Sequence, residues 1–211
     1  MKYTELKEAL NYWIELNFDG KTSTATVVSS LLEEEMQLAS FLCDCAYYCD
    51  GEQEYEQAIR YLKAGLLIHP DQFALLANLG LQYWNLGDEE KALNYLNRSL
   101  EQEPDIADTL VNKATLLIEM NRYAEALEIC DKIQLLHPQD VGGYYNKGKI
   151  FAAMGLYDKA IENLLKAMEL EPGSIYIPEF IAQIYYECLE NEEEAIKYLE
   201  MVEKFSDGLP F

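Results

Sequence analysis

Residues 74–104 read ALLANLGLQYWNLGDEEKALNYLNRSLEQEP, and this stretch holds two runs of apolar residues separated by Gly87 and Asp88. Within each run the apolar residues recur at the three- and four-residue spacing of a helix face. Pro104 follows the second run, and proline both lacks an N–H donor and disfavours helix at the residue before it. The stretch therefore predicts two helices joined by a tight turn, with the second helix ending before Pro104.

The same pattern recurs with a period of 34 residues. The prolines that close the pattern are Pro70, Pro104, Pro138 and Pro172. A second column contains alanine alone, at Ala58, Ala92, Ala126 and Ala160. A third contains only small residues, at Ala46, Gly80, Ala114 and Gly148. We expect this third column to let the two helices of a unit approach closely. Repetition at a fixed period predicts helix pairs stacked into a solenoid.

The stretch quoted above and GGYYNKGKIFAAMGLYDKAIENLLKAMELEP (142–172) resemble the tetratricopeptide repeat. The resemblance implies an all-α, right-handed α-solenoid with five units, at 39–72, 73–106, 107–140, 141–174 and 175–205, and a tail at 206–211. In the fifth unit, Ala195 follows Tyr185 by ten residues, whereas Ala160 follows Phe151 by nine. We therefore expect a one-residue insertion in the acidic turn 190–194.

Residues 1–38 lie outside the period. Their apolar spacing predicts helices over about 4–17 and 27–36, with a loop around Gly20. This N-terminal helical segment either caps the exposed edge of the solenoid or serves in self-association or partner binding, and a homodimer through residues 1–38 is one form of that alternative.

The charge of the chain excludes several classes of partner. With 38 acidic and 16 basic side chains, the 211 residues carry a formal net charge of −22. So large an acidic excess disfavours nucleic acid and anionic membranes, whose recognition depends on clustered Lys and Arg. The first residues have no apolar core of a signal peptide, and the longest uncharged run, 73–87, is too short and polar to span a bilayer. We expect a soluble, cytoplasmic protein whose five cysteines are thiols.

The sequence does not place candidate catalytic or metal-binding residues together in one site. His69 and His137 each precede a repeat proline, in turns that we expect to be exposed and two units apart. Cys45 and Cys49 fall in core columns, with no further ligands to complete a zinc site. The acidic runs lack the ligand alternation of a calcium loop. No phosphate-binding loop or nucleophile elbow is present. We therefore expect no catalytic residue, no metal and no cofactor, and predict that the protein is not an enzyme.

In the family that the chain resembles, the first helices of the units line a concave groove for peptides or helices of partners. Carried over by column, the groove residues are Asp44, Tyr47, Asn78, Leu81, Trp84, Asn112, Thr115, Glu119, Tyr145, Asn146, Lys149, Phe180, Gln183, Tyr186 and Glu187. Asn78, Asn112 and Asn146 repeat at 34 residues. They either bond a peptide backbone or support the repeat itself, and both interpretations remain open at this stage.

Some members of that family hold a C-terminal carboxylate with a clamp of Lys, Arg and Asn. The matching positions here are Cys43, Tyr47, Asp108 and Asn112, so a carboxylate tail is not the expected ligand. The groove columns instead contain Asp44, Asp108, Glu119, Glu179 and Glu187 against the single cation Lys149. Together with its aromatic residues, this composition favours a protein or peptide ligand that is basic and partly apolar.

The resulting hypothesis is a non-enzymatic protein-interaction module that binds a peptide or helix in its groove. Two alternatives remain. One is a secretion-type chaperone holding an unfolded client, although such chaperones usually have about three repeats. The other is a regulatory subunit of an enzyme complex. Co-purification with mass spectrometry discriminates between an interaction protein, which retains a stoichiometric protein partner, and an enzyme.

Overall fold

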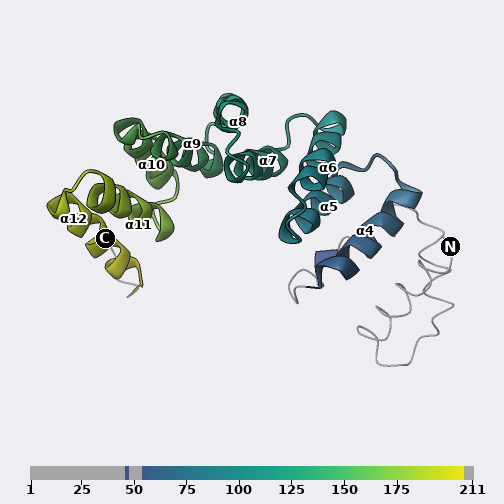
Figure 1. The fold of residues 1–211 in the computed structure, drawn as a ribbon, viewed down its shortest axis with the longest axis horizontal. Coiled ribbons are helices and arrows are strands. Elements are labelled where there is room, and N and C mark those ends of the chain that lie inside the picture. The colour runs from purple at the N-terminus through teal and green to yellow at the C-terminus, as the bar shows by residue number, and fades with distance from the viewer. Residues whose placement is uncertain (1–45, 48–53, 207–211) are drawn as a thin grey trace. The chain divides into compact units, whose positions relative to one another are not determined.

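The computed structural model describes residues 46–47 and 54–206, and the regular structure of these residues is helical throughout (Figure 1). The elements are α4 (Tyr55–Ile68), α5 (Phe73–Asn85), α6 (Glu89–Gln102), α7 (Ala107–Glu119), α8 (Tyr123–Leu136), α9 (Val141–Ala153), α10 (Tyr157–Leu170), α11 (Tyr176–Gln183), the π-helical turn η1 (Ile184–Cys188) and α12 (Glu192–Ser206). The all-α prediction is confirmed for this part of the chain. The helices predicted within residues 1–38, and Asp44, lie outside it.

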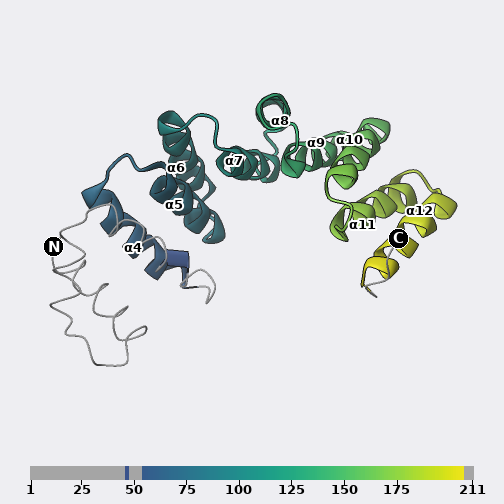
Figure 2. The same cartoon turned by 180° about the vertical axis from the view of Figure 1, so that it is seen from behind.

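The chain divides into two compact units, Met1–Thr109 and Leu110–Phe211. In the first unit, α4, α5 and α6 follow one another as antiparallel neighbours, and in the second α9 packs on α10 and α11 on α12 (Figures 1 and 2). The helix α7 begins at the end of the first unit and continues in the second. Each unit is built from the helix–turn–helix pairs that the sequence predicts.

The turn within each helix pair has a geometry that recurs along the chain. A residue with positive φ occupies the middle of each turn: Gly87 at 76°, Asn121 at 58°, Gly155 at 73° and Glu190 at 52°. Glycine adopts this left-handed conformation at no steric cost, and asparagine adopts it more easily than other side chains. Side-chain caps follow the turn in α6 and α12, where Asp88 and Asn191 accept the backbone N–H of Lys91 and Glu194 at 3.2 and 3.1 Å.

The extra residue of the fifth unit lies in a helix and not in the acidic turn. In the earlier turns, the backbone N–H before the second helix bonds a carbonyl five residues back, as Leu156 does with Phe151 at 2.8 Å. In the last turn, Asn191 bonds Tyr185 at 2.9 Å, six residues back. The π-helical turn η1 (Ile184–Cys188) overlaps this stretch, and a π-helical turn holds one residue more than an α-helical turn. The predicted insertion at 190–194 was therefore wrong in position.

The small-residue column does allow close helix approach, as predicted. A Cβ added to Gly80 would lie 2.8 Å from Cγ of Leu96, and one added to Gly148 would lie 2.7 Å from Cγ of Leu164. Both leucines are fully buried. A third close approach, absent from the sequence predictions, brings Gly143 of α9 against Ile133 of α8, where an added Cβ would lie 2.7 Å from Cγ2.

The core of the second unit includes a cluster between α10 and α11. Its buried members are Ala160, Ile161, Leu164, Ala167, Ile177, Ile181 and Ile184. Cys130 is also fully buried, in the column that Leu96 and Leu164 occupy elsewhere, and is therefore a small core residue. His69 and His137 are the C-cap residues of α4 and α8, but they are half-buried, and the expected exposure of their turns was wrong at these side chains.

Candidate peptide-binding surface

The predicted groove residues of the first compact unit, Met1–Thr109, lie on α5 or before α4. Tyr47 is 82 % exposed, whereas Asn78, Leu81 and Trp84 are half-buried on α5. All four residues lie on segments that the 34-residue period predicts to be the first helices of their repeats. Asn78 and Trp84 each take part in at least one interaction.

In the second compact unit, Leu110–Phe211, three aromatic rings lie together, and we call them the aromatic cluster: Tyr145 on α9 with Tyr176 and Phe180 on α11. The ring centroids of Tyr145 and Tyr176 are 5.1 Å apart and their planes meet at 88°, while those of Tyr145 and Phe180 are 6.2 Å apart at 62°. Edge-to-face contacts of this kind stabilise aromatic pairs beyond the area they bury. The cluster therefore forms a defined apolar surface that joins α9 to α11.

Tyr176 was not among the groove residues predicted from the sequence, which in the fifth unit begin at Phe180. The signal was present, because an aromatic residue four positions before Phe180 lies on the same face of a helix. Tyr176 is 43 % exposed, and its hydroxyl donates to Oε2 of Glu171 at 2.7 Å. Partial burial, together with the hydrogen bond to the Glu171 carboxylate, raises the pKa of Tyr176 to about 12. This residue therefore stays a neutral donor near neutral pH.

Charged groups of both signs surround the cluster. The ammonium nitrogen of Lys149 lies 6.0 Å from the ring centroid of Tyr145, within the range of a cation–π contact. Burial first, and then the nearby carboxylate of Glu179, raises the pKa of Tyr145. The Glu179 side chain is itself exposed. The surface thus combines aromatic rings with carboxylates, and one lysine from α9 is already placed against a ring.

Asn146 has a structural role in this unit. Its side chain is only 3 % exposed, and Nδ2 donates to Oγ1 of Thr115 at 2.9 Å and to the carbonyl of Val111 at 3.5 Å. The Thr115 hydroxyl in turn donates to the same carbonyl at 2.9 Å. These bonds tie α9 to α7 and satisfy polar groups that would be costly to leave unpaired. Of the two roles proposed for this asparagine column, support of the repeat is the one that Asn146 fills.

The remaining predicted residues of the second compact unit are not part of the aromatic cluster. Gln183 donates from Nε2 to Oε2 of Glu187 at 3.1 Å across one helical turn. Tyr186, which lies in the π-helical turn, is 62 % exposed. Glu119 is exposed at the end of α7, and Asn112 is half-buried on the same helix. The structure therefore brings Tyr145, Lys149 and Phe180 into one surface patch.

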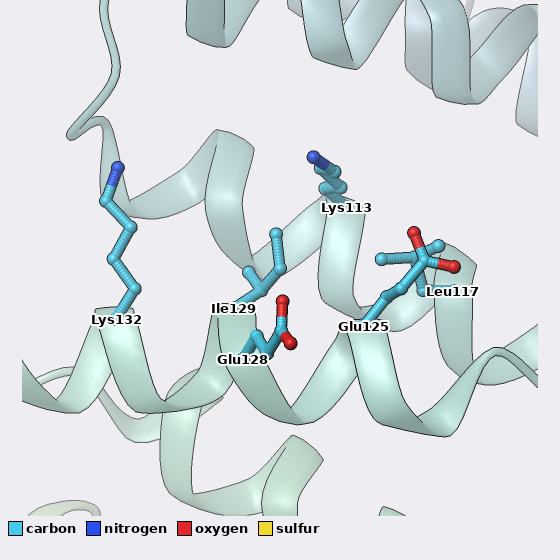
Figure 3. Close-up of a pocket in the computed structure, with 6 residues that line it drawn as sticks. All are labelled: Lys113, Leu117, Glu125, Glu128, Ile129 and Lys132. Carbon is cyan, nitrogen blue, oxygen red and sulfur yellow. The ribbon is translucent and has the colours of Figure 1, made fainter.

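A separate pocket of about 330 Å³ opens between α7 and α8. Figure 3 shows Glu128, Ile129 and Lys132 extending from α8 to the same side, with Lys113 and Leu117 contributed by α7 and Glu125 at the start of α8. Burial lowers the pKa of the half-buried Lys113, whereas the hydrogen bonds from Arg122 lower the pKa of Glu125. The pocket is lined by two lysines, two glutamates and two apolar side chains, and it was not predicted from the sequence.

Metal ligands and membrane-spanning helices are two features that would point to other functions. Among the residues that the structure describes, no group of three or more His, Cys, Asp or Glu side chains is arranged to hold a metal ion. Within the same residues, no helix combines the length and apolar character needed to cross a bilayer.

The fold and the site define the class of protein as an all-α helical-repeat solenoid whose helix pairs recur with the 34-residue period. Two models of the tetratricopeptide repeat match the chain, over residues 83–146 and 142–174. The chain therefore contains tetratricopeptide repeats, which these models place between residues 83 and 174. Repeats of this family generally act as non-enzymatic modules for protein interaction. No curated protein sequence matches the chain.

Several solved structures resemble the fold. MamA from Desulfovibrio magneticus RS-1, residues 41 to the end, is 22 % identical, with 81 % of this chain and 96 % of that one covered at a TM-score of 0.68. The pilF protein of Pseudomonas aeruginosa is 20 % identical, with 84 % and 79 % covered at a TM-score of 0.73. YrrB, described as a tetratricopeptide repeat protein with an unusual peptide-binding site, is 18 % identical, with 95 % and 94 % covered at a TM-score of 0.60. At these identities the likeness concerns the fold.

Proposed function

We propose that this protein is a non-enzymatic interaction module that binds a peptide or helix of a protein partner on the first helices of its repeats. The observation that carries the proposal is the aromatic cluster, because Tyr145, Tyr176 and Phe180 offer partly exposed rings from two successive first helices. Aromatic side chains give large contact areas at low cost in conformational entropy, and they are enriched where proteins bind one another. The unusual peptide-binding site described for YrrB is consistent with this use of the fold.

The ligand that suits this surface is basic and partly apolar. Glu179 and Glu187 are exposed on α11 and η1, and Glu119 is exposed at the end of α7. The net charge of −22 adds a long-range attraction for cations. Carboxylates beside aromatic rings attract Lys and Arg side chains through charge and through the ring faces. The cytoplasmic location and the self-association through residues 1–38 remain predictions.

The test uses the full chain with Asn112, Tyr145 and Phe180 replaced together by alanine. A partner is first identified by co-purification and mass spectrometry and is then titrated against purified variants by calorimetry. We expect the triple variant to lose at least about tenfold in affinity, since truncating two aromatic contacts and one amide removes more than about 1.4 kcal/mol.

The matched control is Leu135→Ala. Leu135 is 80 % exposed on α8, a second helix of its unit, and lies outside the predicted groove. We expect this variant to bind as the wild type does. Circular dichroism must show equal helicity in all the proteins. Unchanged affinity in a folded triple variant would place the binding site on another surface and contradict the proposal.

A further inference from the structure

Lys149 is the subject of an inference that rests on the proposed function of the aromatic cluster. Lys149 lies one helical turn after Tyr145 on α9, and its ammonium nitrogen is 6.0 Å from the Tyr145 ring centroid. Among the residues that the structure describes, this ring is the partner shown for the Lys149 ammonium. The ammonium of Lys149 thus lies against the ring of Tyr145, and the pKa of Tyr145 is also raised by the carboxylate of Glu179.

Repeat packing does not require a cation at this position. The residues that share the column of Lys149 in the other units are Tyr47, Leu81, Thr115 and Gln183. None of these side chains is charged, so the fold accepts neutral residues there. Tyr145 is likewise specific to its repeat, because the other repeats have Cys43, Ala77, Val111 and Glu179 in its column. The lysine and the ring that it contacts are therefore a local pair that the solenoid as such does not explain.

We propose that Lys149 is a built-in competitor for the cationic side chain of the ligand. In the free protein its ammonium lies against Tyr145, and binding replaces it with an arginine of the partner. The exchange favours arginine, because a planar guanidinium stacks on aromatic faces and is more weakly hydrated than an ammonium. The displaced Lys149 regains water at little cost, since its stem is long and flexible. The ligand class is thus a peptide that places an arginine beside an apolar residue.

This competition makes a directional prediction for Lys149→Met, which keeps the length and apolar character of the stem but removes the charge. The variant frees the ring face and removes a like charge from the site. We expect it to bind the arginine probe roughly three- to tenfold more tightly than the wild type does, from the loss of an exposed cation–π contact and of repulsion at about 6 Å.

The matched control is Lys159→Met, because Lys159 lies over the ring of Phe151 at 5.6 Å in the same unit but outside the aromatic cluster. It causes the same change in net charge and loses the same kind of contact. The probe is N-acetyl-arginine amide, with N-acetyl-citrulline amide as its neutral isostere, titrated against full-length protein. Binding is followed by the aromatic NMR shifts of Tyr145, Tyr176 and Phe180, at about 150 mM salt so that distant charges are screened.

Support requires tighter binding of the arginine probe by Lys149→Met, no change for Lys159→Met, and no effect of the citrulline probe. Equal tightening in both variants would indicate net charge alone and overturn the inference, as would unchanged or weaker binding in Lys149→Met. If the probe shifts the cluster equally in all three proteins, the proposed function stands and the competition fails. If it shifts the cluster in none, both the competition and the choice of a basic ligand fail.

Discussion

At the scale of single residues, the asparagine column has different surroundings in different repeats. Asn146 is buried and bonded to Thr115 and to the carbonyl of Val111, whereas Asn112, one unit earlier, is half-buried on α7. A buried amide that has found partners stabilises the fold, but an amide near the surface stays available to bind a ligand backbone. Support of the repeat is therefore the role of Asn146, whereas bonding to a peptide backbone remains a prediction for Asn112.

Cys130 leads to a prediction about reactivity. Burial, the main cause, raises the pKa of this thiol to about 12, so the nucleophilic thiolate is nearly absent at neutral pH. Since the pKa is raised, reactivity in the folded protein should appear only as the pH rises towards about 12. At about pH 8 we expect iodoacetamide to label Cys130 at least about a hundredfold more slowly than the exposed Cys188, as measured by peptide mass spectrometry.

Urea serves as the internal control, since unfolding exposes both thiols and should make their labelling rates similar. Fast labelling of Cys130 in native protein would show that the core around it opens readily.

At the scale of helices, register-equivalent positions in α10 and α12 have different surroundings. Leu164 is fully buried between its neighbours, whereas Leu199 in the same column is 47 % exposed. Ile161 and Ile196 differ in the same way, at 8 % and 54 % exposed. In α10 this face packs on α11, while among the described residues α12 has no following helix to cover it.

The pair Leu164→Ala and Leu199→Ala tests this difference. We expect Leu164→Ala to lower the free energy of unfolding by about 2–5 kcal/mol, because it leaves a cavity in a core where Gly148 lies close to this side chain. Leu199→Ala should cost less than about 1 kcal/mol, since about half of its surface is already hydrated. Urea unfolding followed by circular dichroism provides the comparison, and equal costs would mean that another surface covers α12.

The π-helical turn η1 also belongs to this scale. The stacked pair Tyr83 and Tyr95, with centroids 5.4 Å apart, has its register equivalent in Tyr185 and Tyr198, 5.8 Å apart. The inter-helix contact is thus preserved although the spacing in sequence grows from 12 to 13 residues. A wider turn absorbs the extra residue because it adds one position to the helix without moving the second helix out of register.

Deleting Glu187 from η1 should consequently be tolerated, because the turn then closes as an ordinary α-helical one. We expect the free energy of opening of α12 to change by less than about 1 kcal/mol, as measured by native-state hydrogen exchange. Deleting Asn191 should cost at least about 1 kcal/mol more, since the side chain that caps α12 at the N–H of Glu194 is lost. A larger cost for deleting Glu187 than for deleting Asn191 would indicate that the extra residue lies in the acidic turn.

At the scale of the whole molecule, the net charge of −22 predicts opposite salt effects on stability and on binding. Salt screens the repulsion among carboxylates, so the melting temperature should rise between about 50 and about 500 mM sodium chloride. The same screening weakens the attraction for a basic partner, so affinity should fall at least about threefold over this range. Calorimetric scans and titrations measure the two effects, and an affinity that rises with salt would contradict a basic ligand.

The sequence by itself determined the helix pairs, their period, the small-residue column and the family, because these depend on local spacing that repetition makes visible. Only the tertiary structure decided where the fifth unit holds its extra residue, since a turn and a widened helix lengthen the sequence equally. It also decided that Asn146 is engaged, that Tyr176 joins Tyr145, and that Lys149 lies against a ring. The first two facts depend on contacts between helices, and the third depends on the side-chain conformation of Lys149 within α9. A column in the sequence says which residues are equivalent but not which neighbours they contact.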